Sequence, residues 1–292
     1  MIARGIDAQS HGVLSEASLK SWTMSGDHSE ILLALFVDNL QVSNHSYGSP
    51  TGWSQCGENW YWYGDPLIDF TEDWEFGSYT TQTRSIDTRM ASYIYFQEVR
   101  SSGNHRTEVG PAAGSEHFYF DGNSWIISTD IREPDGGVDG FDSLHPEACA
   151  KNALVVGNVN KPIEGEEIQL RLSSSIGPTD DGRIKPDLVS VGSSVYSTKT
   201  GSTDSYGLLS GTSISAPSVT ALVALLQEVY KSGHASPSHP NGRRRPFSST
   251  IRAAILHNTA EAGSADGPDY KFGWGMLDAN AATMHVLYEN FT

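Results

Sequence analysis

Short apolar runs separated by polar turns predict alternating helices and buried strands along this chain. Ile31–Val37 is apolar on every side and leads through Leu40–Ser43 into the polar corner Asn44–Gly48, as a buried helix that feeds a strand would. Later β-branched runs at Leu154–Gly157 and Leu188–Gly192 end in polar or glycine-containing turns, which is typical of parallel strands covered on both faces. The pattern predicts an α/β fold.

Two further segments have the spacing of helices. From Ser213 to Tyr230 one face is apolar and alanines fill the others, so we expect a helix that is buried nearly all round. The apolar face consists of Val219, Leu222, Val223, Leu226 and Val229. A shorter packing helix is predicted over Ser249–His257, after the turn-rich segment Ser236–Pro246.

The segment Ser49–Thr88 differs from the rest of the chain because it is polar and aromatic, with four of the seven tryptophans. We interpret it as a long, self-packed surface excursion at about residues 49–88, of a kind that often carries function. No internal repeat and no strongly polar linker divides the sequence. We therefore expect one domain over residues 1–292.

The charge balance limits the classes of partner. Nineteen basic and 35 acidic side chains give a formal net charge of −16, which argues against a surface that binds nucleic acid. No apolar run reaches the roughly 18 residues that a membrane span requires, and the first residues lack the apolar region of a signal peptide. We predict no nucleic-acid partner, no membrane span and no cofactor.

Cysteines and charged clusters give weaker signals. Cys56 and Cys149 leave one disulfide or none as open alternatives. The loop Asp135–Asp142 gathers three carboxylates, as some calcium sites do, but its spacing fits no EF-hand. We interpret it as a solvated turn and predict no metal. The only basic run, Arg243–Arg245, is interpreted as an exposed loop, with a processing site for another protease as the alternative.

The most informative segment is Leu209–Pro217, LSGTSISAP, in which a glycine-containing turn passes directly into the predicted helix. Ser213 would stand at the helix N-terminus, where free backbone N–H groups and the helix dipole would stabilise an oxyanion beside its hydroxyl. Spacing alone leaves two interpretations open, a plain N-cap serine or a nucleophile.

Six segments together resemble the subtilisin-like serine proteases, or subtilases, in the order in which that family has them. GTSISAP followed by an alanine-rich helix is similar to the family's nucleophile segment, and Val42–Gly48 (VSNHSYG) to its substrate-binding strand. Ser101–Asn104 (SSGN) is similar to the family's Ser-Ala-Gly-Asn, whose asparagine donates to the oxyanion. The other three are Ala150–Gly157, Gly182–Val189 and Gly273–Ala279, so the resemblance covers essentially the whole chain.

The resemblance implies a three-layer α/β/α subtilisin-like fold with a mostly parallel central sheet, and a secreted or cell-surface serine-type endopeptidase. Ser213 would form the acyl-enzyme, while its backbone N–H and the Asn104 amide would hold the oxyanion. The strand end would pair with an extended protein or peptide substrate, opposite a second wall of the specificity pocket. These substrate-binding residues would be Ser46, Tyr47, Gly48, Ser102 and Gly103.

Two parts of the family pattern have no counterpart here, the strand that ends in Asp-Ser/Thr-Gly and the His-Gly-Thr-His helix. None of the ten histidines lies in such a motif. His11 lies in a stretch similar to the one that follows the histidine helix, so we expect the N-terminal segment with the catalytic aspartate and histidine to be missing. A chain without a base would be nearly inactive by itself, and its sheet would keep an exposed edge.

Other interpretations remain beside this one. A non-catalytic peptide-binding relic of a subtilase is the main alternative, whereas an α/β-hydrolase is disfavoured because GTSIS is not a Gly-x-Ser-x-Gly elbow. Gln97 and Glu98 also interrupt the apolar strand that the family has before the oxyanion asparagine. Because an unpaired buried carboxylate costs several kcal/mol, the register and the burial of that strand are open.

Overall fold

The computed structural model of the 292-residue chain describes all residues except 1, 3–7, 25, 138, 234–244 and 289–292. The turn predicted over 236–246 and the basic run Arg243–Arg245 therefore fall almost entirely outside the described residues. At the centre lies a four-stranded parallel sheet in the order β1-β4-β7-β8. Its strands are β1 (Val42–His45), β4 (Gln97–Ser101), β7 (Leu154–Val159) and β8 (Leu188–Val191).

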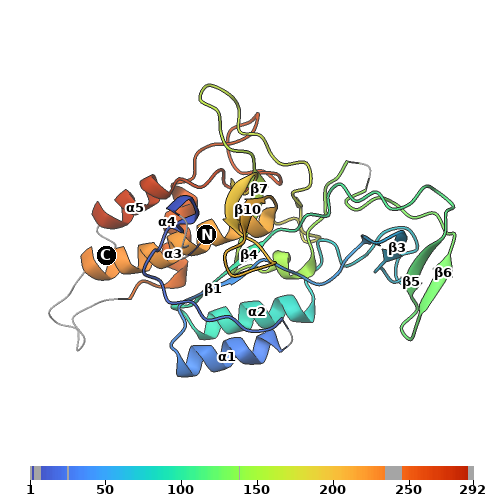
Figure 1. Ribbon diagram of the computed structural model, residues 1–292, viewed down its shortest axis with the longest axis horizontal. Helices are drawn as coiled ribbons and strands as arrows, with labels where there is room; N and C mark the ends of the chain where they lie inside the picture. The colour runs from blue at the N-terminus through green and yellow to red at the C-terminus, as the bar shows by residue number, and fades with distance from the viewer. Residues whose placement is uncertain (1, 3–7, 25, 138, 234–244, 289–292) are drawn as a thin grey trace.

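Helices cover both faces of this sheet and complete three layers (Figure 1). Along β7 the side chains alternate, so that Leu154 and Val156 pack against one set of helices and Val155 against the other. The first set is α3 (Thr212–Gly233), α4 (Ser248–His257) and α5 (Ala279–Tyr288), and the second is α1 (Asp27–Val37), α2 (Thr81–Ser92) and the 3-10 helix η2 (Pro146–Cys149). The α/β/α fold with a parallel sheet is confirmed.

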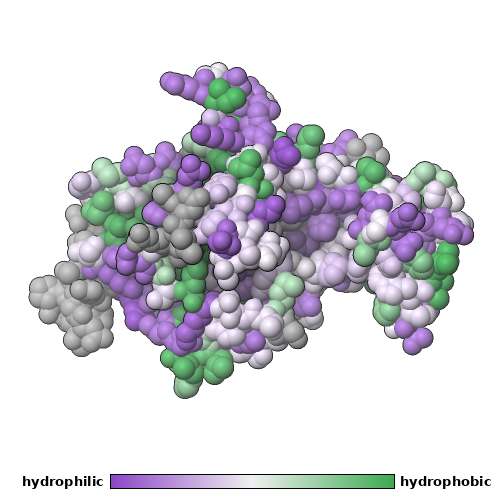
Figure 2. Space-filling model, in the orientation of Figure 1, coloured by the Kyte–Doolittle hydropathy of each residue, from purple (hydrophilic) through white to green (hydrophobic). Residues whose placement is uncertain are grey.

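The helix expected over Ile31–Val37 is present, but it is not buried on every side. Ile31 faces the core at 5% exposure, whereas Leu33, Phe36 and Val37 are 60%, 85% and 65% exposed. Figure 2 shows the resulting apolar area at the lower edge of the molecule, over α1. Because α1 lies in an outer layer, only the side that faces the rest of the fold finds partners among the described residues.

A second, smaller sheet projects to one side of the molecule (Figure 1). Its strands are β2 (Trp53–Cys56), β3 (Asn59–Trp62), β5 (His117–Phe120) and β6 (Trp125–Ser128), in the order β2-β3-β5-β6. The segment 49–88 is therefore not self-packed, because β3 pairs with β5 from outside it and α2 packs into the main body. Thr80 exchanges hydrogen bonds with Thr83 in a capping box, which starts α2 inside the expected excursion.

The remaining elements lead into the site or lie near the ends of the chain. The short 3-10 helix η1 (Ala8–Ser10) precedes α1, and an antiparallel hairpin of β9 (Val195–Thr198) and β10 (Tyr206–Leu209) leads into α3.

Both cysteines are free, with Cys56 exposed and Cys149 buried. Within the described residues, no helix has the length and apolar character needed to cross a membrane.

Strand β4 contains Gln97 and Glu98 and is nevertheless fully buried, in regular parallel register with β1 and β7. Arg89 of α2 and Arg100 of β4 donate to the Glu98 carboxylate at 2.7 and 2.6 Å. Burial acts to raise the pKa of Glu98, but Arg100, His45 and Arg89 together lower it to about 2. The cost of an unpaired carboxylate does not arise, because one partner stands two residues along the strand and the other comes from a helix.

Candidate active site

Ser213 stands in the first turn of α3, directly after a glycine-shaped turn. Gly211 has a φ of 144°, which residues with a side chain rarely adopt. Its carbonyl accepts from the Ile214 N–H at 2.9 Å. The Ser213 N–H makes no hydrogen bond with the described residues, as expected of the first donors of a helix. A hydroxyl and a free backbone donor therefore meet at one point.

Two reciprocal hydrogen bonds join Ser213 to the segment that follows β1. Ser213 Oγ donates to the Ser46 carbonyl oxygen at 3.1 Å, and Ser46 Oγ donates to the Ser213 carbonyl oxygen at 3.0 Å. Pro217 lacks the N–H that would bond to this carbonyl inside the helix, so the carbonyl is free to accept from Ser46. The proline thus allows α3 to be fixed to the neighbouring segment at the serine.

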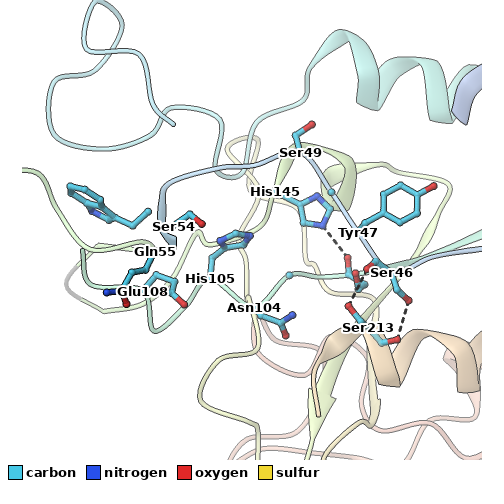
Figure 3. Close-up of a pocket in the computed structure, with 14 residues that line it drawn as sticks. Ser46, Tyr47, Ser49, Ser54, Gln55, Asn104, His105, Glu108, His145 and Ser213 are labelled. Carbon is cyan, nitrogen blue, oxygen red and sulfur yellow. Dashed lines mark hydrogen bonds between the residues drawn. The ribbon is translucent and has the colours of Figure 1, made fainter. Parts of the chain in front are cut away.

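Asn104 is oriented by the residue that precedes Ser213. The Thr212 N–H donates to Asn104 Oδ1 at 3.1 Å, and Thr212 Oγ1 lies 3.2 Å from the same oxygen. Because Oδ1 is occupied, the amide NH2 group is left for the cavity beside Ser213 (Figure 3). Gly103 has a φ of 113°, and a Cβ there would lie 2.8 Å from Ser175 Oγ, so the turn before Asn104 requires glycine.

These groups line one cavity of about 410 Å³, formed where the chain leaves β1 and β4 (Figure 3). Neighbouring parallel strands end at the same sheet edge, which brings the two following segments together. The lining residues are Ser46, Tyr47, Gly48, Ser49, Trp53, Ser54, Gln55, Ser101, Gly103, Asn104, His105, Glu108, His145 and Ser213. Of the residues expected at the site, Ser102 alone does not line it: its side chain is fully buried, and Oγ donates to the Ser175 carbonyl at 3.0 Å.

His145 and Glu147 fix the segment after β1, and sequence reasoning found no motif for either. The Ser49 N–H and Oγ donate to the Glu147 carboxylate at 3.2 and 2.6 Å, and His145 Nδ1 lies 3.0 Å from it. Burial acts to raise the pKa of Glu147, but the hydrogen bonds from His145 and Ser49 hold it well below its usual range. A Cβ on Gly48 would lie 2.3 Å from the His145 ring, so this contact requires glycine.

A polar chain behind the site connects β1 to the middle of α3. Thr220 Oγ1 lies 2.9 Å from Asn44 Oδ1, and Asn44 Nδ2 donates to Ser46 Oγ at 3.0 Å. Since Ser46 is bonded to Ser213, side chains on two elements fix the position of the serine. These partners are far apart in the sequence, so no local signal predicts them.

The imidazoles near the site have partners other than Ser213. His45 is buried, with its ring nitrogens 2.7 Å from Tyr47 Oη and 2.8 Å from Ser43 Oγ. His105 stands 3.7 Å from a carboxylate oxygen of Asp135, and burial beside His145 lowers the pKa of His105 to about 4. Within the described part of the chain, no histidine is hydrogen-bonded to Ser213 Oγ.

The loop 135–142 carries the three carboxylates of Asp135, Asp139 and Asp142. Among the residues that the structure describes, no group of three or more His, Cys, Asp or Glu side chains is placed to hold an ion. Asp135 instead accepts from the Trp53 N–H at 2.9 Å, and burial raises its pKa to about 8. Its carboxyl group shapes the start of β2.

The other edge of β1 borders a second cavity, of about 490 Å³. It is lined by all four residues of β1, by residues 17–24, and by Thr220 and Ala224 of α3, but by no residue of β4. In the described residues β1 has no strand neighbour on this edge. An unpaired edge offers a row of free N–H and C=O groups to a further strand.

One family model matches most of the chain. Residues 2–275 match the family model described as Peptidase_S8, Subtilase family. C5a peptidase of Streptococcus pyogenes is 34% identical over 122 residues, which cover 41% of this chain and 10% of that protein. The match to this curated relative thus spans only a tenth of its length.

Two solved structures are similar in fold. The Clostridium perfringens CspB protease has a TM-score of 0.62 at 14% identity, over 96% of this chain and 75% of that one. The protease domain of PatA has a TM-score of 0.58 at 15% identity, over 100% of this chain and 79% of that one. At these identities the likeness concerns the fold.

Proposed function

Because the chain belongs to the subtilase family, we propose that it is a serine-type endopeptidase that hydrolyses peptide bonds through an acyl-enzyme on Ser213. The observation that carries the proposal is the meeting of Ser213 Oγ, the Ser213 N–H and the Asn104 amide at one cavity. A peptide carbonyl between them would have a nucleophile at its carbon and two uncharged donors at its oxygen.

The reaction has two steps, acylation and deacylation of Ser213, and both need a base and donors to the carbonyl oxygen. A base first removes the Ser213 proton, Oγ bonds to the carbonyl carbon, the C–N bond breaks, and the leaving amine takes the proton. Water then attacks the acyl-enzyme in the same way, which releases the carboxylic acid and restores the hydroxyl. The carbonyl oxygen is negatively charged in both transition states, so the two donors act twice.

The substrate would lie as an extended strand beside Ser46–Gly48, with Gly103 on the opposite side. Ser102 would contribute through its backbone, since its side chain is buried. Protein or peptide substrates and a secreted or cell-surface location belong to the same proposal, and both rest on the family.

In the described residues Ser213 Oγ donates to the Ser46 carbonyl and is not hydrogen-bonded to a histidine. The proposal therefore has to add a base. We place the aspartate-bearing strand on the free edge of β1, beside the 490 Å³ cavity, with the histidine next to it. The 292-residue chain is then nearly inactive by itself, and a segment that adds this strand completes the enzyme.

A non-catalytic peptide-binding protein is the second candidate. The bond from Ser213 Oγ to the Ser46 carbonyl favours it, because a serine held in this way is not activated. The cavity and the strand segment would serve peptide binding equally well. The two candidates differ only in whether Ser213 reacts.

Labelling with a fluorophosphonate separates them. A helix N-terminus stabilises charge by only about 0.3–2 kcal/mol, too little to ionise an alcohol, so the 292-residue chain should not label. Extended by an upstream segment, as one chain or as two fragments, the protein should label at Ser213 and hydrolyse amides. Ser213→Ala should abolish both, while Ser218→Ala, a partly buried serine further along α3, should preserve both.

Hydrolysis that survives Ser213→Ala would remove the central assignment. An extended chain that binds peptides but neither labels nor hydrolyses them would establish the second candidate. Labelling of the 292-residue chain at Ser213, blocked by replacing one of its histidines, would show that the base is already present.

A further inference from the structure

The cavity beside Ser213 extends away from the serine to an acidic end. In Figure 3, Asn104 and His105 follow Ser213 across the cavity, and Glu108 lies beyond them near Ser54 and Gln55. These last side chains come from β2 and from the turn after β4, where the small sheet meets the main body. The far end of the cavity is thus built by the chain's own aromatic excursion.

Glu108 is the unpaired charge of this cavity. Its backbone is fixed, because its N–H donates to the His105 carbonyl at 2.8 Å and its carbonyl accepts from the Asp135 N–H at 2.9 Å. Its carboxylate, in contrast, has no hydrogen bond or ion pair with any described residue, and partial burial raises its pKa. A half-buried carboxylate on a fixed backbone is costly unless something charged or polar meets it.

No cation of the described chain supplies that partner. The fourteen lining residues include no lysine and no arginine. His105 is partly exposed at 27% for its side chain, and burial beside His145 keeps its ring in the neutral form near neutral pH, with a pKa of about 4. His145 also lines the cavity, but it is engaged by the Glu147 carboxylate at 3.0 Å. The cavity therefore offers one unpaired anionic group beside hydrogen-bonding groups such as Ser54 and Gln55.

We propose that this cavity selects peptides whose residue next to the reacting carbonyl has a long basic side chain, lysine or arginine, with Glu108 as its counter-ion. The inference rests on the proposed function for the direction of the peptide. A volume of about 410 Å³ lies in the range of sites that enclose a whole ligand group. A cation there would compensate Glu108 for the part of its hydration that burial removes.

Arginine and citrulline make the sharpest pair of probes, because they have the same shape and differ in charge. N-acetylated tetrapeptides that end in either residue are titrated into the 292-residue protein by calorimetry, with no hydrolysis required. We expect the arginine peptide to bind about tenfold more tightly, the preference typical of one partly desolvated ion pair. In Glu108→Gln the preference should fall below about twofold.

Two further variants control for net charge and for folding. Glu116→Gln removes the same charge from an exposed site outside the cavity and should keep the tenfold preference. Glu108→Lys should reverse the selectivity in favour of a peptide that ends in glutamate. A reversal requires a folded cavity, so it separates a local effect from unfolding.

Each outcome bears on one claim. Equal binding of the arginine and citrulline peptides, a preference unchanged in Glu108→Gln, or no binding of either peptide at millimolar concentration would overturn the inference. A Glu108-dependent preference in a protein that never labels at Ser213 would leave the inference standing and remove the proposed peptidase. Ser213-dependent hydrolysis without a charge preference would do the opposite.

Discussion

The two edges of β1 are built differently. Toward β4, the strand is paired, and the buried groups Glu98, Arg89 and Arg100 support it from behind. Toward the other side, it borders a cavity of about 490 Å³ and the helix α1, whose apolar residues Leu33 and Phe36 are exposed. Ser213, Asn104 and the strand segment proposed to bind the substrate all depend on the first edge. The proposed base belongs to the second.

Removing the buried Glu98 carboxylate should destabilise the paired edge of β1 most. Glu98→Ala leaves Arg89 and Arg100 buried without a counter-ion, and such a loss costs about 3–5 kcal/mol of unfolding free energy. Urea denaturation measures it. Glu16→Ala, an exposed acid of the segment near the open edge, should stay within about 0.5 kcal/mol. Similar values for the two variants would mean that the edges do not differ in this way.

Removing the proposed amide donor should affect catalysis far more than stability, since the folded chain loses only the hydrogen bonds of Asn104 Oδ1 with Thr212. In the extended, active protein, Asn104→Ala should lower turnover by about 10²–10³ with little change in the Michaelis constant, since the donor meets charge only in the transition state. This range is the one known for such a donor in subtilisin, a member of the same family. Steady-state kinetics test it. A defect confined to the Michaelis constant would assign Asn104 to ground-state binding.

Acid should destabilise the paired edge of β1 through the protonation of His45. Burial lowers its pKa from 6.5 to about 4, so between these values the unfolded chain binds a proton that the folded chain does not. The contribution of His45 to stability should therefore fall as the pH drops from about 6.5 to about 4, by at most about 1.4 kcal/mol per pH unit, while His105 adds a contribution of the same sign and Asp135 one of the opposite sign. His45→Gln should flatten this part of the curve, whereas His11→Gln, at an exposed position, should not. A slope equal to that of the unmodified protein in His45→Gln would show that His45 does not contribute.

The smallest effect is expected at the open side. Phe36 is 85% exposed, so Phe36→Ser should change the unfolding free energy by no more than about 0.5 kcal/mol and should raise solubility. Denaturation and light scattering follow the two effects. Should the variant lose several kcal/mol, the apolar face of α1 would be covered in solution, and the contrast between the edges would vanish.

Much of the fold was predictable because local patterns reflect local physics. The runs that form β7, β8, α3 and α4 are apolar with the period of their element, and parallel strands need both faces covered. The burial of α1 was predicted wrongly for a matching reason. A run that is apolar on every side indicates how much apolar surface the helix has. Only the neighbouring layers decide which part of that surface is buried.

The candidate site likewise has residues that the local sequence predicts and contacts that it does not predict. A Gly-Thr-Ser turn before a helix and an Asn after Ser-Gly can be recognised locally, and both segments reach the cavity. Ser102 is adjacent to Gly103 but turns into the core toward Ser175, so adjacency did not predict its exposure. The burial of Glu98 was left open by the sequence, because Arg89 lies on another element and only packing brings the two together.

The sequence by itself determined the alternation of helices and buried strands, the position of Ser213 at a helix N-terminus and the glycines that permit close approach, because each follows from backbone geometry and from neighbours within a few residues. The tertiary structure alone decided what lies around them. It paired Glu98 with two arginines, turned Ser102 inward, brought His145 against Gly48, and left Glu108 without a partner at the end of the cavity. These contacts join residues that are distant along the chain, and their free energy depends on burial, which no single segment contains.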